Sequence, residues 1–241
     1  MKTLSADVVV VGGGSTGAGV VRDVAMRGYS AILVDRADLG QGTTGRFHGL
    51  LHSGGRYVVS DPHSATECAE ENAIIARIQA HAVERTGGYF VATHVDDPAW
   101  GDDWAKGATD TKVPFEEVSV NEVLKAEPRV NPKISRAFKV EDGSVDGWQL
   151  VWSAANSAKL YGAQILTYHR VTKIERDGDR VAQVICTDEK TGEEVRINTN
   201  FVLNCAAAWG GQIAHMAGCP DVQVVPGAGI MFATNHRLTN S

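Results

Sequence analysis

The chain has 241 residues, 43% of them hydrophobic, which is enough for one large folded domain or two smaller ones. Its net charge of −6 argues against a general nucleic-acid-binding protein, and no stretch approaches the ~18 apolar residues of a membrane span. Four scattered cysteines, without a Cys-x-x-Cys pair, argue against a metal site and a disulfide framework. A cytoplasmic protein is expected, since too few residues precede the first strand for a signal peptide.

The chain opens with the pattern of a nucleotide-binding β-α-β unit. Residues 6–11 (ADVVVV) predict a buried strand, and residues 18–27 carry apolar side chains at helical spacing. Between them lies the glycine-rich turn at residues 12–17 (GGGSTG). A second strand is expected over residues 30–34, and it ends at Asp35. The order strand, glycine-rich turn, helix, strand and acid is typical of a Rossmann-like dinucleotide site.

Each motif residue has a physical role in that interpretation. Gly12 allows the tight turn out of the strand, Gly14 lets the backbone approach a pyrophosphate, and Gly17 lets helix and strand pack closely. The helix N-terminus offers free N–H groups to the phosphates, and Asp35 can accept hydrogen bonds from ribose hydroxyls. The alternative is a glycine-rich turn that binds no ligand.

A long polar and glycine-rich segment follows, over residues 36–57. Its threonines, arginines and histidines favour a loop that wraps a phosphorylated cofactor, because long loops between elements are usually functional. The alternative is a solvated loop with incidental charges.

The middle of the chain alternates helices and strands. Asp61 and Pro62 are expected to start an amphipathic helix. The predicted elements are a helix over 61–82, a strand within 85–95, a short helix that buries Trp100 and Trp104, a strand over 113–120, a helix over 122–127, a strand over 134–140 and a helix over 146–161.

From residue 164 the chain is rich in β-strand patterns. A β-meander is predicted from turns at Asp177-Gly178 and at residues 190–192. The expected elements are strands at 165–167, 171–176, 181–186, 194–197 and 201–204, a helix ending at Ala217, and strands at 222–225 and 230–233.

Four segments together resemble the FAD-dependent glycerol-3-phosphate dehydrogenases, and among these most of all the catalytic A subunits of the anaerobic enzymes. These segments are the opening turn, GRFHGLLHSGGRY (45–57), VEDGSVD (140–146) and VLNCAAAWG (202–210). The resemblance covers the whole chain but only the first half or so of such a protein. It implies an α/β fold in which a Rossmann-like FAD-binding domain of the glutathione-reductase/D-amino-acid-oxidase type carries an inserted α+β substrate domain.

The resemblance also implies domain boundaries. The FAD-binding domain would comprise residues 1–88 and, with the β-meander, 146–217, and the substrate domain would comprise 89–145 and the truncated start of a further segment at 218–241. Because the later segments of the family are missing, the chain alone is expected to bind FAD weakly and to turn over little substrate.

The resemblance assigns the FAD contacts residue by residue. Thr43 to Arg46 would line the pyrophosphate and ribityl chain, His52 would lie near the isoalloxazine, and Val171 would meet the adenine through its backbone. The implied cofactor-binding residues are Gly12, Gly14, Ser15, Thr16, Gly17, Asp35, Arg36, Thr43, Thr44, Gly45, Arg46, His48, Leu51, His52, Val171, Ala206, Ala207 and Trp209.

The implied reaction is oxidation of sn-glycerol 3-phosphate to dihydroxyacetone phosphate, with electrons passing to a quinone-linked acceptor. Its implied catalytic residues are His52, Arg56 and Tyr57. Arg56 suits a phosphate because its guanidinium binds two oxygens at once. His52 could assist proton transfer or could simply orient the flavin. No metal is expected, and the implied partners are membrane-anchor and iron–sulfur subunits at the inner face of the cell membrane.

Two departures from the family pattern stand out. Ala206-Ala207 replaces the usual Ala-Gly, so the methyl group of Ala207 would crowd the cofactor, and the lysine of the later Pro-x-Lys-Gly pattern is absent from residues 226–229. Three other functions remain open: an FAD-dependent amino-acid or amine oxidase, a nicotinamide-dependent dehydrogenase and a non-catalytic FAD-binding fragment. The long segment at 36–57 argues against the nicotinamide enzyme.

Overall fold

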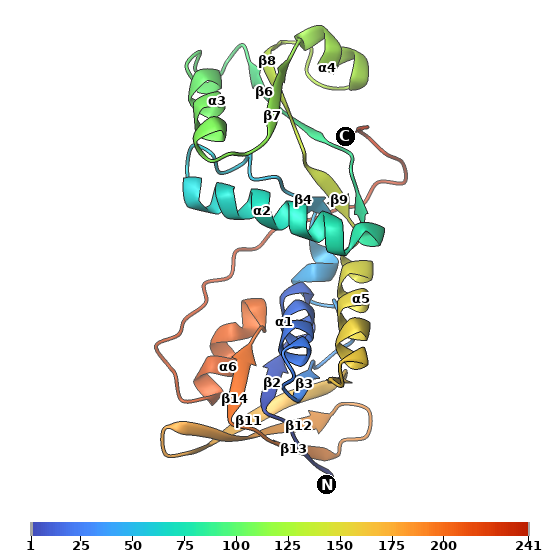
Figure 1. The fold of residues 1–241 in the computed structure, drawn as a ribbon, viewed down its shortest axis with the longest axis vertical. Helices are drawn as coiled ribbons and strands as arrows, with labels where there is room; N and C mark the ends of the chain where they lie inside the picture. Colours follow the sequence, from blue (N-terminus) through green and yellow to red (C-terminus); the bar gives the residue numbers. More distant parts are fainter. Residues whose placement is uncertain (1, 241) are drawn as a thin grey trace. The chain divides into compact units, whose positions relative to one another are not determined.

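The computed structural model describes residues 2–240, which form two compact units. The first unit comprises the chain up to Phe47 together with Gly147–Met231, and the second comprises His48–Asp146 and the residues from Phe232 onward. The division differs from the predicted domain boundaries, because residues 48–88 group with the second unit rather than with the first. Figure 1 shows the fold in colours that follow the sequence from the N-terminus to the C-terminus.

The first unit is built on a parallel sheet of four short strands. Its strand order is β10-β3-β2-β14, with β2 at Val8–Val11, β3 at Ala31–Val34, β10 at Gln164–Leu166 and β14 at Phe201–Asn204. Val8 pairs with Ala31 on one side and with Phe201 on the other. The continuous apolar run of β2 follows from this position, because a central parallel strand is buried on both faces.

Two layers cover the faces of this sheet. Helices α1 (Ser15–Met26) and α5 (Gly147–Leu160) lie side by side on one face (Figure 1), where Val10 and Leu33 pack against their apolar side chains. On the other face, Val9 and Ile32 pack against an antiparallel meander. Its strands are β11 at His169–Asp177, β12 at Arg180–Asp188 and β13 at Glu194–Asn198. The predicted meander is therefore correct.

A further strand, β1 at Lys2–Ser5, joins the meander and was not predicted. It pairs in parallel with β13, with Leu4 opposite Ile197. Its sequence Lys-Thr-Leu-Ser has only one apolar residue, so the strand depends on the edge that β13 offers rather than on its own pattern.

The end of the first unit departs from prediction. After β14, a 3₁₀ turn (η3) at Ala207–Trp209 leads into helix α6 at Gly210–Met216. The strands predicted at 222–225 and 230–233 are wrong, since these residues have no strand conformation. Val225 and Ile230 are each 92% exposed. Without a neighbouring strand, these apolar residues have no partner for the backbone hydrogen bonds of a sheet.

The second unit contains two small antiparallel sheets and three helices. One sheet has the order β6-β8-β7 and the other has the order β4-β9-β5. The strands are β4 at Leu50–Leu51, β5 at Val83–Glu84, β6 at Gly88–Thr93, β7 at Phe115–Val118, β8 at Ile134–Val140 and β9 at Gly143–Val145. The helices are α2 at Pro62–Ile78, α3 at Trp100–Asp110 and α4 at Val120–Ala126.

An aromatic cluster forms the core of the second unit. Trp104 of α3 stacks on Phe138 of β8 with ring centroids 4.8 Å apart, and Phe90, Phe115 and Trp100 belong to the same cluster. Helix α2 begins as predicted, since Asp61 caps it by accepting from the backbone N–H of Ser64 at 3.1 Å. The helix ends at Ile78, and a separate 3₁₀ turn (η2), Ala80–Ala82, takes the place of the predicted last turn.

Candidate functional site

The turn between β2 and α1 requires the glycines of the opening motif. Gly12 has φ +110°, and a Cβ there would lie 2.4 Å from the carbonyl oxygen of Cys205. A Cβ on Gly17 would lie 1.8 Å from the carbonyl oxygen of Gly12. Gly14 is the N-cap of α1 and has no side chain of its own to cap the helix. No side chain of these glycines therefore covers the backbone N–H groups at the N-terminus of α1.

Asp35 and Thr44 lie at this turn. One carboxylate oxygen of Asp35 accepts from the backbone N–H of Gly13 at 2.6 Å and the other accepts from that of Ala37 at 2.8 Å. The hydroxyl of Thr44 accepts from the backbone N–H of Ser15 at 3.0 Å. Each carboxylate oxygen of Asp35 keeps a further lone pair, so it can still accept from a hydroxyl.

Residues 40–46 fold into a compact loop in the first unit. Thr43–Arg46 (η1) forms a 3₁₀ turn, and Arg46 donates to the backbone carbonyls of Gln41 and Gly42. A Cβ on Gly45 would lie 2.6 Å from the carbonyl oxygen of Gly40 and 3.1 Å from the ring of Trp148. The loop therefore presents Thr43 and Thr44 from a tightly packed backbone.

Three further predicted contacts follow the end of β14. Ala206 lies against the glycine turn, because a Cβ on Gly12 would lie 3.1 Å from its Cα. Ala207 has φ +47°, in the left-handed region that favours glycine. The ring of Trp209 lies 4.2 Å below the guanidinium carbon of Arg36, a cation–π contact.

Val171 belongs to the same unit but is oriented differently. It pairs with Cys186 in the meander, and its side chain is buried in the core between the meander and the parallel sheet. Its side chain is therefore not available to a ligand, and the expected backbone contact with the adenine stays a prediction.

The first unit thus suits a dinucleotide. The glycine turn, Asp35 and the residues after β14 all follow the carboxyl ends of parallel strands, where open α/β sheets bind their ligands. A pyrophosphate requires backbone N–H groups that it can approach closely, which glycines and a helix N-terminus provide. A ribose requires an acceptor for its hydroxyls, which the carboxylate of Asp35 provides.

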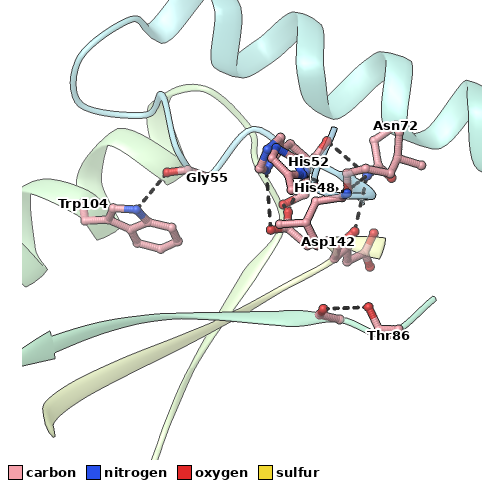
Figure 2. A network of polar contacts seen from close by, with 12 residues as sticks. His48, His52, Gly55, Asn72, Thr86, Trp104 and Asp142 are labelled. Atoms are coloured by element: carbon pink, nitrogen blue, oxygen red, sulfur yellow. Dashed lines mark hydrogen bonds and ion pairs between the residues drawn. The ribbon is translucent and has the colours of Figure 1, made fainter. Parts of the chain in front are cut away.

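The remaining predicted residues lie in the second unit, on the segment from His48 to Tyr57. Figure 2 shows how side chains of α2, of α3 and of the turn between β8 and β9 hold this segment. The amide of Asn72, on α2, donates to the carbonyls of Leu51 and His52 at 3.1 Å each. The indole of Trp104 donates to the carbonyl of Gly55 at 3.0 Å.

Backbone geometry fixes the same segment from within. Gly54 has φ +99°, and a Cβ there would lie 2.3 Å from the carbonyl oxygen of Ala65 on α2. A Cβ on Gly55 would lie 2.6 Å from the ring of Phe90. The two glycines let the segment pass between α2 and the aromatic cluster, so the side chains before and after them have defined positions.

His52 is half-buried beside two other titratable side chains. Its Nδ1 lies 3.9 Å from a carboxylate oxygen of Asp142, and its ring meets that of His48 edge-on with centroids 5.1 Å apart. Burial lowers the pKa of His52, the charge of Asp142 raises it, and the charges of His48 and Arg56 lower it. The net shift is downward, which favours the neutral imidazole at pH 7.

Arg56 and Tyr57 follow the two glycines. Arg56 is exposed, and its guanidinium carbon lies 6.0 Å from the centroid of the Tyr57 ring. Arg56 also borders a cavity of about 190 Å³, which Phe90, Trp100 and Trp104 line. Leu51 lies in β4, opposite Gly143.

The structure therefore places the predicted site residues in two sets, one in each unit. The first unit holds Gly12, Gly14, Ser15, Thr16, Gly17, Asp35, Arg36, Thr43, Thr44, Gly45, Arg46, Val171, Ala206, Ala207 and Trp209, and the second holds His48, Leu51, His52, Arg56 and Tyr57. Sequence reasoning missed Asn72 and Asp142. The signal for Asn72 was a polar side chain on a face of α2 that also carries Ala65 and Ala76.

The glycine turn and the doubly covered parallel sheet define the first unit as a dinucleotide-binding domain. The chain belongs to the FAD dependent oxidoreductase family, whose model matches residues 7–240. FAD is the cofactor of this family, as predicted.

Two curated relatives show where the chain lies within this family. It is 43% identical over 246 residues to the A1 subunit of the anaerobic glycerol-3-phosphate dehydrogenase of Haloferax volcanii, and the match covers 98% of this chain and 42% of the relative. It is 41% identical over 234 residues to the A subunit of the anaerobic enzyme of Escherichia coli K12, with coverage of 97% and 43%. The chain thus spans less than half the length of these relatives. The predicted resemblance is confirmed.

Solved structures share the fold. The L-proline dehydrogenase of P. horikoshii superposes with a TM-score of 0.78 at 21% identity, covering 90% of this chain and 57% of that one. The L-alpha-glycerophosphate oxidase of Mycoplasma pneumoniae, solved with FAD bound, gives 0.73 at 22% identity, with coverage of 90% and 58%. The predicted fold class is confirmed. Within residues 2–240, no helix has the length and apolar character needed to cross a membrane.

Proposed function

We propose that the protein containing this chain oxidises sn-glycerol 3-phosphate to dihydroxyacetone phosphate with FAD as the cofactor. The observation that carries this proposal is the identity of 36–43% to the A subunits of anaerobic glycerol-3-phosphate dehydrogenases over nearly the whole chain. The likeness to L-proline dehydrogenase and glycine oxidase is at 21% identity and supports only the shared fold.

The first unit holds the FAD in this proposal. The turn at Gly12–Gly17 and the N-terminus of α1 receive the pyrophosphate, and Asp35 accepts from the ribose hydroxyls of the ADP half. Thr43, Thr44, Gly45 and Arg46 line the pyrophosphate and ribityl chain. The donor geometry described above supports this assignment, because the glycines leave space that side chains would otherwise fill.

The second unit supplies the side chains for the substrate. FAD, when bound, would supply the two-electron oxidation of carbon 2 of the substrate. Arg56 binds the substrate phosphate through two guanidinium N–H groups, with Tyr57 beside it. His52 receives the proton of the hydroxyl at carbon 2, because a neutral imidazole has one nitrogen lone pair to offer.

Further polypeptides belong to the same proposal. The relatives are each named as one subunit of an enzyme, which supports further subunits for this protein as well. We assign these partners as a membrane anchor and an iron–sulfur subunit that pass electrons to a quinone-linked acceptor. The protein would then work at the cytoplasmic face of the membrane.

The test is the flavin spectrum of the full-length protein under anaerobic conditions. Glycerol 3-phosphate should bleach the flavin absorbance, whereas L-proline and glycine should not. The Arg56→Lys variant keeps the charge but loses the bidentate geometry. Its kcat/KM for glycerol 3-phosphate should therefore be lower, by a factor that corresponds to a loss of about 1–3 kcal/mol of transition-state stabilisation.

The matched control for that variant is Arg77→Lys, at an exposed position of α2, which should leave the kinetics unchanged. Bleaching by an amino acid and not by glycerol 3-phosphate would replace the proposal with an amino-acid oxidase. If Arg56→Lys leaves the kinetics unchanged, Arg56 does not bind the substrate phosphate.

A further inference from the structure

Asp142, in the turn between β8 and β9, is anchored on one side and faces His52 on the other. One of its carboxylate oxygens accepts from the backbone N–H of Ser53 at 2.7 Å and from the Ser53 hydroxyl at 2.6 Å. Its second oxygen lies 3.9 Å from Nδ1 of His52. Ser53 is only 2% exposed, so this anchor is sheltered from water. The carboxylate is thus held in a fixed direction relative to the imidazole (Figure 2).

Asn72 restrains the same histidine through the backbone. Its amide donates to the carbonyls of both Leu51 and His52, and its side chain is 9% exposed in the middle of α2. A helix of four to five turns provides a rigid base for this contact. The position of the His52 backbone therefore depends on α2, while the orientation of its ring depends on the turn after β8.

The surroundings of the imidazole determine which nitrogen carries the proton. Three titratable groups act electrostatically on His52: the carboxylate of Asp142, the ring of His48 and the guanidinium of Arg56. The carboxylate lies on the Nδ1 side, and a carboxylate beside one ring nitrogen favours the tautomer with its proton there. The Nε2 lone pair is then free to accept a proton.

We propose that Asp142 and Asn72 are positioning residues for proton transfer to His52. Asp142 holds the Nδ1–H tautomer and Asn72 holds the backbone, so that Nε2 is presented to the hydroxyl of the substrate. The inference rests on the proposed function. In the step it serves, the O–H bond of the substrate would break and its proton would go to Nε2, while the hydride of carbon 2 would go to the FAD as the C=O bond forms.

A purely structural role for Asp142 is the competing explanation, and Asp142→Asn separates the two. The asparagine oxygen can still accept from Ser53, so the turn keeps its anchor. The asparagine NH₂ group would then face Nδ1 as a donor and favour the opposite tautomer, with the proton on Nε2. A structural role would leave the histidine unaffected, whereas a positioning role would not.

The test uses the full-length, FAD-loaded protein. In Asp142→Asn, kcat for glycerol 3-phosphate should fall about 100-fold, the usual lower range for loss of a general base, with KM changed less than about threefold. Loss of the carboxylate should also lower the pKa of His52. The acidic limb of the kcat profile then moves to lower pH, because the base is neutral down to a lower pH.

A second readout does not depend on turnover. Hydrogen–deuterium exchange at the histidine C2–H, followed by mass spectrometry, reports the pKa of His52 directly in each variant. Asn72→Ala should reduce kcat about tenfold while leaving that pKa unchanged, because Asn72 acts on the backbone and carries no charge. Asp96→Asn is the matched control, since Asp96 also accepts from a backbone N–H and a hydroxyl, those of Thr93, and should behave as wild type.

The outcomes separate the inference from the function on which it rests. Wild-type kcat and an unchanged His52 pKa in Asp142→Asn would overturn the positioning role. If Asp142→Asn does not fold, Asn72→Ala decides, and a wild-type kcat in that variant counts against the inference. Failure of glycerol 3-phosphate to reduce the flavin of the wild-type protein would instead overturn the proposed function.

Discussion

Ala207 shows how one residue can carry strain at a predicted cofactor contact. Its φ of +47° lies in the left-handed region, where a Cβ costs roughly 1–2 kcal/mol relative to glycine. It begins the 3₁₀ turn after β14, and the residue before it, Ala206, lies against the glycine turn. The backbone there thus adopts a conformation that favours glycine although the side chain is alanine.

We therefore expect Ala207→Gly to stabilise the protein. The gain should be up to about 1 kcal/mol, because relief of the left-handed strain exceeds the extra entropy that glycine gains when unfolded. Thermal unfolding measures this effect, and titration with FAD would show tighter binding if the methyl group crowds the cofactor. Ala208→Gly, at the exposed next position without positive φ, is the control and should destabilise. Equal losses in both variants would contradict the strain argument.

At the scale of elements, α3 connects the core of the second unit to the segment that carries Arg56. Trp104 is 2% exposed, stacks on Phe138 of β8, and donates to the carbonyl of Gly55. A single indole therefore both packs the core and satisfies the backbone immediately before Arg56.

Trp104→Phe should destabilise the protein by about 2 kcal/mol. Phenylalanine has no N–H, so the Gly55 carbonyl loses its donor, and the smaller ring leaves a cavity beside Phe138. Chemical denaturation measures the loss. Trp100→Phe, in the partly exposed neighbour of the same cluster, should cost clearly less. If the two variants lose the same stability, the hydrogen bond to Gly55 contributes nothing.

At the scale of the whole molecule, acidic side chains make stability depend on pH. Folding lowers the pKa of carboxyl groups that accept hydrogen bonds or pair with cations: Asp7, Asp61, Asp96, Glu117, Glu175 and Asp188. A lowered pKa stabilises the fold above the unfolded value of about 4, and this contribution is lost as pH falls through the folded value.

The Tm should therefore fall only slightly from about pH 7 to 5, where the lowered pKa of His52 makes the unfolded chain the better proton binder, and fall more steeply below about pH 4. The largest cause of the shift is a hydrogen bond from a hydroxyl or backbone N–H in four of the six groups, Asp7, Asp61, Asp96 and Asp188. Added salt should consequently change the acid limb little, since screening acts on charge pairs. Differential scanning calorimetry at low and high salt checks this. An acid limb that vanishes in high salt would assign the effect to ion pairs.

The dinucleotide unit could be predicted from sequence because its signals are local. Gly12, Gly17 and Asp35 lie within one β-α-β unit, and their spacing alone requires the close packing that the structure has. The meander followed in the same way, from strand patterns separated by turns at Asp177-Gly178 and at residues 190–192. The cap of α2 at Asp61 was also predicted correctly, since a cap depends on only a few adjacent residues.

Tertiary structure decided the features that join distant parts of the chain. Lys2–Ser5 becomes a strand only because β13 offers an edge, while the apolar residues near 222 and 230 have no such edge and form none. Asp142 reaches Ser53 across 89 positions. A sequence determines local conformation through propensity and spacing, but a partly buried carboxylate such as Asp142 acquires its role from the neighbours that the fold brings to it.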